Sequence, residues 1–202
     1  DVIKLMMSDF EVFRPSQDRY EFVVRFPGPP DTPYEGGTWL VRVTLPDEYP
    51  FKSPSVGFFN RMTHPNVCER SGSICLDVLN STWTPMYDLV NIFSVLLPQL
   101  LRYPNPSDPL NAHAAQLMRQ NPAQYAERIK RTIAGHASGA VVDRMFAAIR
   151  SGEDASAVLA GGATRAAGSA RAAEAPRSPE DASSSSQPPS SSSSSSFLAS
   201  SF

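Results

Sequence analysis

The strongest constraint on the fold of this chain is a change of periodicity along its length. Apolar residues alternate with other residues in segments 20–26, 38–45 and 55–59, as they do in strands. From Asp88 onward they recur instead every three or four positions, as on one face of a helix. A short apolar stretch at 2–6 predicts the end of a further helix before the strands. This order predicts an α+β domain, with an antiparallel sheet of about four strands flanked by helices.

Proline and glycine divide the helical part. The apolar stripe of Asp88–Arg102 predicts one helix, and Pro98 inside it is expected to kink the helix or tighten a turn. Asn121 has the sequence pattern of a helix N-cap, because a proline follows at the first helical position and a glutamine at the third. We expect Gly135 and Gly139 to divide the last helix in two.

The composition changes abruptly after the last helical pattern. The segment that follows is rich in alanine, glycine and serine, with serine runs at 183–186 and 190–196. Its few large apolar residues cannot offset the entropy lost on ordering about 50 residues. We therefore expect a folded domain over 1–150 and a disordered tail over 151–202. The tail is either inert or a regulatory segment phosphorylated on Ser178 or in the serine runs.

Charge and cysteine content narrow the class of protein. The formal net charge is −2, so no basic surface for a nucleic acid is expected. Two cysteines are too few for a disulfide framework and the sequence shows no signal peptide before them, so we expect a reducing compartment, the cytoplasm or the nucleus. The sequence has no apolar run of about 18 residues, so we expect no membrane span. The chain starts with Asp1 rather than Met, so we expect the native N-terminus to lie further upstream.

A long segment without periodicity, 60–86, separates the strands from the helices and contains both cysteines. Segments of this kind in compact domains are often functional. A zinc site needs about four clustered Cys or His ligands, whereas His64, Cys68 and Cys75 supply three at most and form no CxxC pair. A redox pair would also favour CxxC spacing. We therefore expect neither a metal site nor a redox site.

Two interpretations of Cys75 remain open from the residues alone. A cysteine hydrolase needs a histidine base and an orienting Asn or Asp, and the chain offers His64, His113 and His136. Alternatively, Cys75 is a small buried apolar residue, since it stands between an isoleucine and a leucine.

Six short motifs occur in a fixed order along the chain. They are Tyr34-Glu35-Gly36-Gly37, Tyr49-Pro50-Phe51-Lys52-Ser53-Pro54, His64-Pro65-Asn66, Gly72-Ser73-Ile74-Cys75-Leu76-Asp77, Trp83-Thr84-Pro85 and Pro104-Asn105-Pro106-Ser107-Asp108-Pro109-Leu110. Together they resemble the ubiquitin-conjugating enzyme family, and the resemblance covers about residues 1–135, nearly all of a catalytic domain of that family. Within the family, the sequence is similar in particular to the H-type conjugating enzymes, because of segments 78–83 and 97–106 and a longer loop before Cys75.

The resemblance implies a role for each residue of the site. Cys75 would accept ubiquitin as a thioester from an activating enzyme and pass it to a lysine amine of a protein substrate. Asn66 would donate a hydrogen bond to the oxyanion, brace the loop, or do both. Asp108 would orient the incoming lysine and accept its proton, or would only begin a turn. His64 and Asp77 are expected to have structural roles.

The resemblance also implies partners. Phe51, Pro85 and Met86 match two loops that dock a ubiquitin ligase, joined by the first helix around Lys4. The activating enzyme would share this surface, and the helix at 88–102 would hold the donor ubiquitin. A ligase of the GID/CTLH type is a hypothesis. No cofactor is expected in the domain, because the activating enzyme consumes the ATP. Conjugation of another ubiquitin-like modifier and a non-catalytic scaffold are the alternatives.

Overall fold

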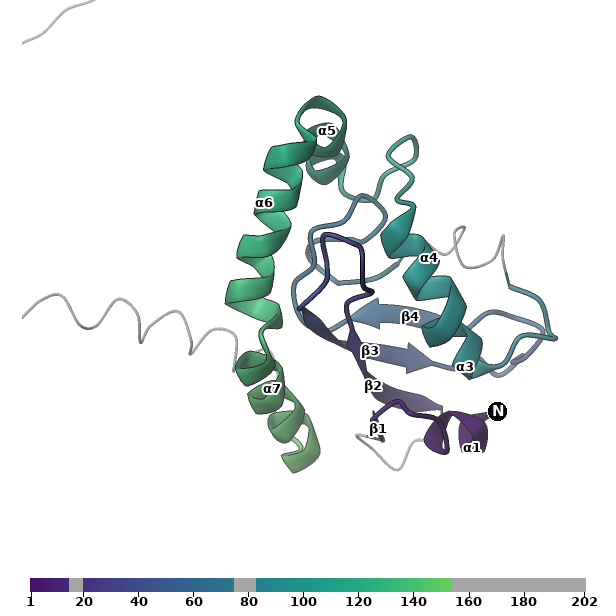
Figure 1. Cartoon of the computed structure of the whole chain (residues 1–202). Helices are drawn as coiled ribbons and strands as arrows, with labels where there is room; N and C mark the ends of the chain where they lie inside the picture. Colours follow the sequence, from purple (N-terminus) through teal and green to yellow (C-terminus); the bar gives the residue numbers. More distant parts are fainter. Residues whose placement is uncertain (15–19, 75–82, 154–202) are drawn as a thin grey trace, which may run out of the picture. The chain divides into compact units, whose positions relative to one another are not determined.

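The structure, a computed structural model, describes residues 1–14, 20–74 and 83–153. The expected tail therefore lies outside the described residues from position 154 onward. No described helix is long and apolar enough to cross a membrane. The helices and strands, in chain order (Figure 1), are α1 (Val2–Met6), β1 (Val12–Phe13), β2 (Glu21–Pro27), β3 (Thr38–Thr44), β4 (Ser55–Phe58), α3 (Leu89–Asn91), the π-helical η1 (Ile92–Leu96), α4 (Leu97–Arg102), α5 (Ala112–Gln120), α6 (Pro122–Thr132), the π-helical η2 (Ile133–Ala137) and α7 (Gly139–Ser151).

The four described strands form one antiparallel sheet in the order β1-β2-β3-β4. The register aligns Val24 of β2 with Val41 of β3, and Val41 with Phe58 of β4. This architecture confirms the predicted α+β class and antiparallel sheet. The strand β1 contains only two residues, which is too short to show an alternation in the sequence.

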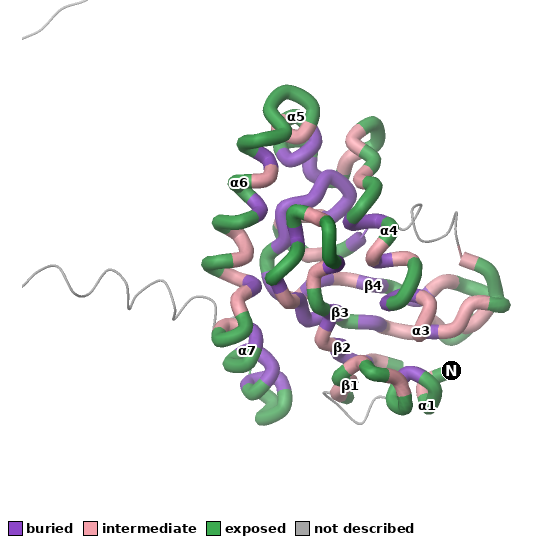
Figure 2. Tube along the Cα trace, viewed as in Figure 1, coloured by how far each residue is buried: buried purple, intermediate pink, exposed green. Residues whose placement is uncertain are grey.

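One face of the sheet packs against the helix formed by α3, η1 and α4. Apolar residues that alternate along β2 and β3 meet the apolar stripe of this helix in the main core. Figure 1 shows the helix crossing the strands, and Figure 2 shows buried residues on both. The buried residues that make this contact include Phe22, Val24, Phe26, Trp39, Val41, Val43, Leu89, Ile92, Phe93 and Leu97.

The opposite face of the sheet is covered by α7. Val23 and Leu40 point to this face and are completely buried. They form a second apolar cluster with Val142, Met145, Phe146 and Ile149 of α7. The sheet is therefore the middle layer between two helical layers, and this explains why β2 and β3 carry apolar residues at consecutive positions.

The central helix departs from the single α-helix that the sequence predicts. Asp88 caps its start, because its carboxylate accepts a hydrogen bond of 3.1 Å from the Asn91 backbone. The backbone then widens into the π-helical turns of η1, just before Pro98 at the start of α4. Pro98 has no N–H for a bond to the preceding turn. The expected disturbance thus takes the form of a wider turn rather than a tighter one.

The last helices follow the predicted caps. The Asn121 side chain accepts a hydrogen bond of 3.1 Å from the backbone of Gln124, as predicted for an N-cap of α6. The helical region is interrupted at Ser138, whose ψ of 150° is extended. This break lies between Gly135 and Gly139, where the sequence predicts a division.

Candidate active site

The segment that leads to Cys75 is a hairpin docked on β4. The Phe58 backbone N–H donates to the carbonyl of Gly72 at 2.9 Å, and the Ile74 N–H donates to the carbonyl of Val56 at 3.2 Å. Ile74 itself is buried in the main core. The chain is therefore anchored up to the residue directly before Cys75.

Gly72 makes this close docking possible. Its φ of +70° lies in the left-handed region, which side chains other than glycine rarely adopt. A Cβ at this position would lie 1.9 Å from the carbonyl oxygen of Phe58. Only glycine therefore fits between the hairpin and the strand.

Two residues that the sequence assigns to the site fall outside the described residues. Cys75 and Asp77 belong to segment 75–82, of which the structure gives no description. Their expected roles, as thioester carrier and as structural residue, remain predictions.

Asn66 is completely buried and connects two loops through its side-chain amide. Its Nδ2 donates to the backbone carbonyls of Asn105 at 2.8 Å and of Asp108 at 3.2 Å. Its Oδ1 accepts from the Asn105 N–H at 2.8 Å. The amide therefore uses both donors and one acceptor to hold the loop at 105–108.

His64 is also completely buried, and both of its ring nitrogens have backbone partners. Nε2 lies 3.1 Å from the Leu100 carbonyl, which can only accept, so Nε2 carries the hydrogen. Nδ1 accepts from the Asn66 N–H at 3.0 Å. Burial lowers the pKa of His64 to about 4, so the ring is neutral at pH 7. In this arrangement neither nitrogen is available to a substrate as a base.

The loop held by Asn66 presents Asp108 to the solvent. The backbone carbonyl of Asp108 accepts a hydrogen bond from Asn66, whereas the residue Asp108 as a whole is exposed. The side chain of Asn105 accepts a hydrogen bond of 3.0 Å from the Ser107 N–H and closes a local turn. The Asp108 carboxylate is thus accessible to an incoming amine.

Buried polar residues that the sequence analysis did not single out support this loop region. Residues 62–67 are all buried, although they form a loop, as Figure 2 shows. The Tyr34 hydroxyl donates to the Thr63 carbonyl at 2.9 Å and lies 2.8 Å from the Tyr125 hydroxyl. Burial raises the pKa of Tyr34 and raises that of Tyr125 to about 12. Tyr34 belongs to the first of the six family motifs, and this is the one sequence signal for the network.

Asn60 is a second buried connector. Its side chain accepts from the Leu40 N–H and donates to the carbonyls of Thr38 and His136, each at 2.9 Å. It therefore ties the start of β3 to η2. A lone asparagine after a strand gives no local signal of this role.

The four residues expected to dock a ligase lie on neighbouring segments. Trp83 Nε1 donates to the carbonyl of Pro50 at 2.9 Å, which joins the segment before Met86 to the loop of Phe51. The Phe51 and Met86 residues are 80% and 93% exposed, and Pro85 is exposed as well. Such large exposed apolar side chains are typical of a contact surface.

The first helix adjoins the same region. Lys4 Nζ of α1 lies 3.5 Å from Asp88 Oδ2, at the start of α3. The ion pair is exposed, so its contribution to stability is small. It nevertheless marks the place where α1 meets the helix that follows the Met86 segment (Figure 1).

The described residues hold no group of three or more His, Cys, Asp or Glu side chains that could bind a metal ion. The two other histidines, His113 and His136, line a different cleft, as described below. The protein is therefore an α+β protein whose site combines a loop held by Asn66 with a hairpin that precedes a cysteine. The one buried histidine of this site is hydrogen-bonded to the backbone through both ring nitrogens.

Comparison with known proteins identifies the family. The sequence model described as ubiquitin-conjugating enzyme matches residues 1–133. The chain belongs to the ubiquitin-conjugating enzyme family. It is an enzyme that accepts ubiquitin from an activating enzyme as a thioester and transfers it to substrate lysine, usually with a ubiquitin ligase. As a rule the family needs no cofactor.

Individual relatives agree with this assignment. The chain is 59% identical over 130 residues to ubiquitin-conjugating enzyme E2 5 of Arabidopsis thaliana, covering 64% of this chain and 70% of the relative. It is 50% identical over 154 residues to ubiquitin-conjugating enzyme E2-24 kDa of Saccharomyces cerevisiae, covering 76% and 71%. Among solved structures, the E2 domain of a Toxoplasma gondii ubiquitin conjugating enzyme has a TM-score of 0.62 at 26% identity, covering 67% of this chain and 93% of that domain.

Proposed function

We propose that Cys75 is the residue that carries ubiquitin. Its thiolate attacks the thioester carbonyl presented by the activating enzyme, and the thiol of that enzyme leaves. A substrate lysine amine then attacks the new thioester, an amide forms, and the Cys75 thiol is released. The observation that carries this proposal is the anchored hairpin, which ends at Ile74 and leads directly into Cys75.

Asn66 has a bracing role in the resting enzyme and a second role during transfer. Both of its amide hydrogens are engaged with carbonyls, so donation to an oxyanion requires one bond to open. The bond to the Asp108 carbonyl is the longer of the two, at 3.2 Å, and is therefore the easier one to exchange. Asp108 would orient the lysine ammonium and accept its proton.

The partners would meet on the surface around Phe51, Pro85, Met86 and Lys4. The activating enzyme and the ligase would compete for it, and a ligase of the GID/CTLH type is the hypothesis for the partner. The domain itself would bind no cofactor, since ATP is consumed by the activating enzyme. We place the activity in the cytoplasm, the nucleus or both.

Thioester loading tests the proposal. The protein is incubated with activating enzyme, ubiquitin and ATP, and the products are separated without reductant. A band heavier by one ubiquitin, removed by thiol, is expected for the wild type and for Cys68→Ala but not for Cys75→Ala. A thioester that persists in Cys75→Ala and disappears in Cys68→Ala would overturn the assignment.

A further inference from the structure

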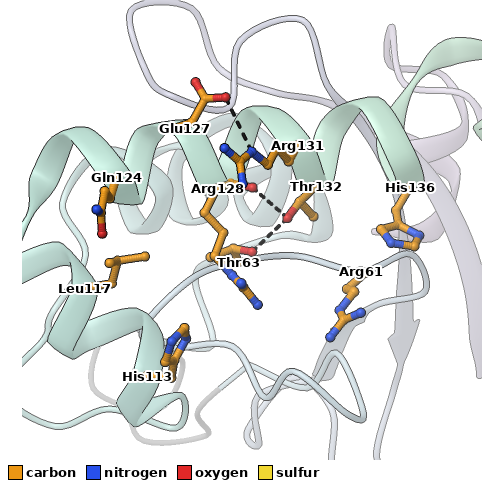
Figure 3. Close-up of a pocket in the computed structure, with 10 residues that line it drawn as sticks. All are labelled: Arg61, Thr63, His113, Leu117, Gln124, Glu127, Arg128, Arg131, Thr132 and His136. Carbon is orange, nitrogen blue, oxygen red and sulfur yellow. Dashed lines mark hydrogen bonds and ion pairs between the residues drawn. The ribbon is translucent and has the colours of Figure 1, made fainter.

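The described structure contains a cleft of about 530 Å³ whose lining does not include Asn66 or Asp108. Its walls come from the segment after β4 and from α5, α6 and η2 (Figure 3). Three of the lining residues are arginines, whereas one is a glutamate. Because the net charge of the chain is −2, this excess of positive charge is local. Arg131 Nε already lies 3.5 Å from the Glu127 carboxylate, so Arg61 and Arg128 are the two arginines to consider for an anion.

The arginines are placed by the helix and by the loop. Gln124, Arg128 and Arg131 lie on one side of α6, because residues three or four positions apart are neighbours on a helix. In Figure 3 the Arg128 side chain extends from α6 into the cleft, on the side where Arg61 also lies. Behind them, the Thr63 and Thr132 hydroxyls are 2.9 Å apart and join the loop to the helix.

His136 also lines the cleft, and one nitrogen of its ring is unpaired within the described part of the chain. Its Nδ1 is buried and has no hydrogen-bond partner among the described residues. Burial and the nearby charge of Arg61 lower the pKa of His136, so the ring is neutral at neutral pH. The ring therefore adds no charge to the cleft, and the arginines supply its positive charge.

A carboxylate of the chain itself already binds the arginines. Glu69 Oε1 lies 2.5 Å from Arg61 Nη2 and 3.8 Å from Arg128 Nη2. The side chains of these two arginines are 50% and 45% exposed, so ion pairs of this kind are weak and exchangeable. A ligand with two negative charges can therefore compete with the single charge of Glu69.

We propose that this cleft binds a phosphate monoester or free phosphate, with Arg61 and Arg128 as its principal ligands and Glu69 as the internal competitor. A phosphoryl group carries nearly two negative charges at neutral pH and several strong acceptor oxygens. The planar guanidinium fork of arginine matches this geometry. The phosphoryl group can come from free phosphate or from a phosphoserine in a peptide.

The first test is binding of inorganic phosphate to the full chain. Phosphate replaces chloride at constant ionic strength, and the arginine Nε–Hε resonances are followed by NMR. Saturable shifts are expected. Arg128→Gln should weaken binding about tenfold, the effect of losing one charge-assisted hydrogen bond. Glu69→Gln should tighten binding, because the competing carboxylate is removed.

Arg144→Gln is the matched control, since it removes the same charge from an exposed position on α7. It should leave the affinity unchanged, and circular dichroism should show that all variants are folded. Equal losses in Arg128→Gln and Arg144→Gln, or shifts that do not saturate, would overturn the proposal. So would weaker binding in Glu69→Gln.

A phosphoserine peptide separates the two sources of the phosphoryl group. A short peptide with one central phosphoserine is compared with its unphosphorylated form. Tighter binding than inorganic phosphate, dependent on Arg128, supports a peptide ligand, whereas equal affinity supports a site for the phosphoryl group alone. Equal binding of both peptide forms would contradict phosphate recognition. These measurements do not involve thioester transfer, so their failure leaves the role of Cys75 untouched.

Discussion

At the scale of single residues, the hydrogen bond from the Asn66 N–H to His64 Nδ1 unites two buried side chains into one brace. Through it, the carbonyl of Leu100 at the central helix is connected to the loop of Asn105 and Asp108. Each of these hydrogen bonds satisfies a polar group that would otherwise be buried without a partner. Removal of either side chain should therefore cost stability as well as activity.

The first prediction concerns Asn66→Ala. The substitution leaves the Asn105 N–H and two carbonyls without their partners, so the free energy of unfolding should fall by about 1–3 kcal/mol. Urea unfolding measures the change, with the exposed Gln116→Ala on α5 as the control. An Asn66→Ala protein as stable as the wild type would show that the amide does not brace the loop.

The second prediction concerns pH. Burial lowers the pKa of His64 from 6.5 in an open chain to about 4. Between these values the unfolded chain binds a proton that the folded protein excludes, so stability is full above pH 6.5 and is lost as the pH falls toward 4. The slope from this group reaches about 1.4 kcal/mol per pH unit.

Urea unfolding at a series of pH values measures this slope. The free energy of unfolding of His64→Gln should depend less on pH than that of the wild type across this window. The exposed Gln116→Ala, which removes no titratable group, is the control and should retain the wild-type slope. Parallel curves for wild type and His64→Gln would contradict the low pKa.

Only part of the site could be predicted at this scale. Family motifs indicate His64, Asn66 and Asp108, but they do not indicate which atoms are already bonded in the resting enzyme. The hydroxyl pair of Tyr34 and Tyr125 joins residues 91 positions apart, and no local pattern encodes such a pairing. Long-range partners of this kind are determined by the packing of the whole domain.

At the scale of elements, α7 is the least expected feature. Its apolar positions predict a helix, but its location on the outer face of the sheet depends on Val23 and Leu40. The alternation in β2 and β3 predicts one buried face, whereas Val23 and Leu40 on the second face are buried as well. The family match ends at residue 133, so α7 lies beyond it.

The third prediction tests whether α7 belongs to the cooperative domain. Phe146 is 5% exposed, its ring centroid lies 6.1 Å from that of Phe13, and the Arg25 guanidinium lies 5.6 Å from its ring. Phe146→Ala should lower the free energy of unfolding by about 3–5 kcal/mol. The exposed Arg144→Ala in the same helix should change it by less than about 0.5 kcal/mol.

Hydrogen exchange gives a second measurement for the same variant. If α7 unfolds with the sheet, Phe146→Ala should speed exchange in both α7 and β3. Faster exchange confined to α7, with the unfolding curve unchanged, would show instead that α7 is an independent attachment.

At the scale of the whole molecule, the fold brings together three segments that are distant in the sequence. Phe51, Met86 and Lys4 belong to a loop before β4, a segment before α3, and α1. The hydrogen bond from Trp83 to Pro50 and the ion pair from Lys4 to Asp88 join these segments. The exposed apolar residues are thus held in place without being part of the core, as a docking surface requires.

The last prediction separates docking from chemistry. Phe51→Ala and Met86→Ala should each reduce ligase-stimulated discharge of ubiquitin by about tenfold, the loss expected for an exposed anchor worth more than 1 kcal/mol in an interface. Because both side chains are exposed, the free energy of unfolding should change by less than about 0.5 kcal/mol. Discharge to free lysine without ligase should be unchanged, since neither residue belongs to the loop that Asn66 braces.

A ligase of the GID/CTLH type, loaded enzyme and a single-turnover discharge assay provide the measurement. Arg144→Ala serves as the surface control. Loss of both reactions together would place Phe51 and Met86 in the catalytic step rather than in docking, and an unchanged ligase response would remove them from the contact surface. A ligase response lost only in these two variants, with discharge to free lysine unchanged, means that this surface binds the ligase and takes no part in the transfer itself.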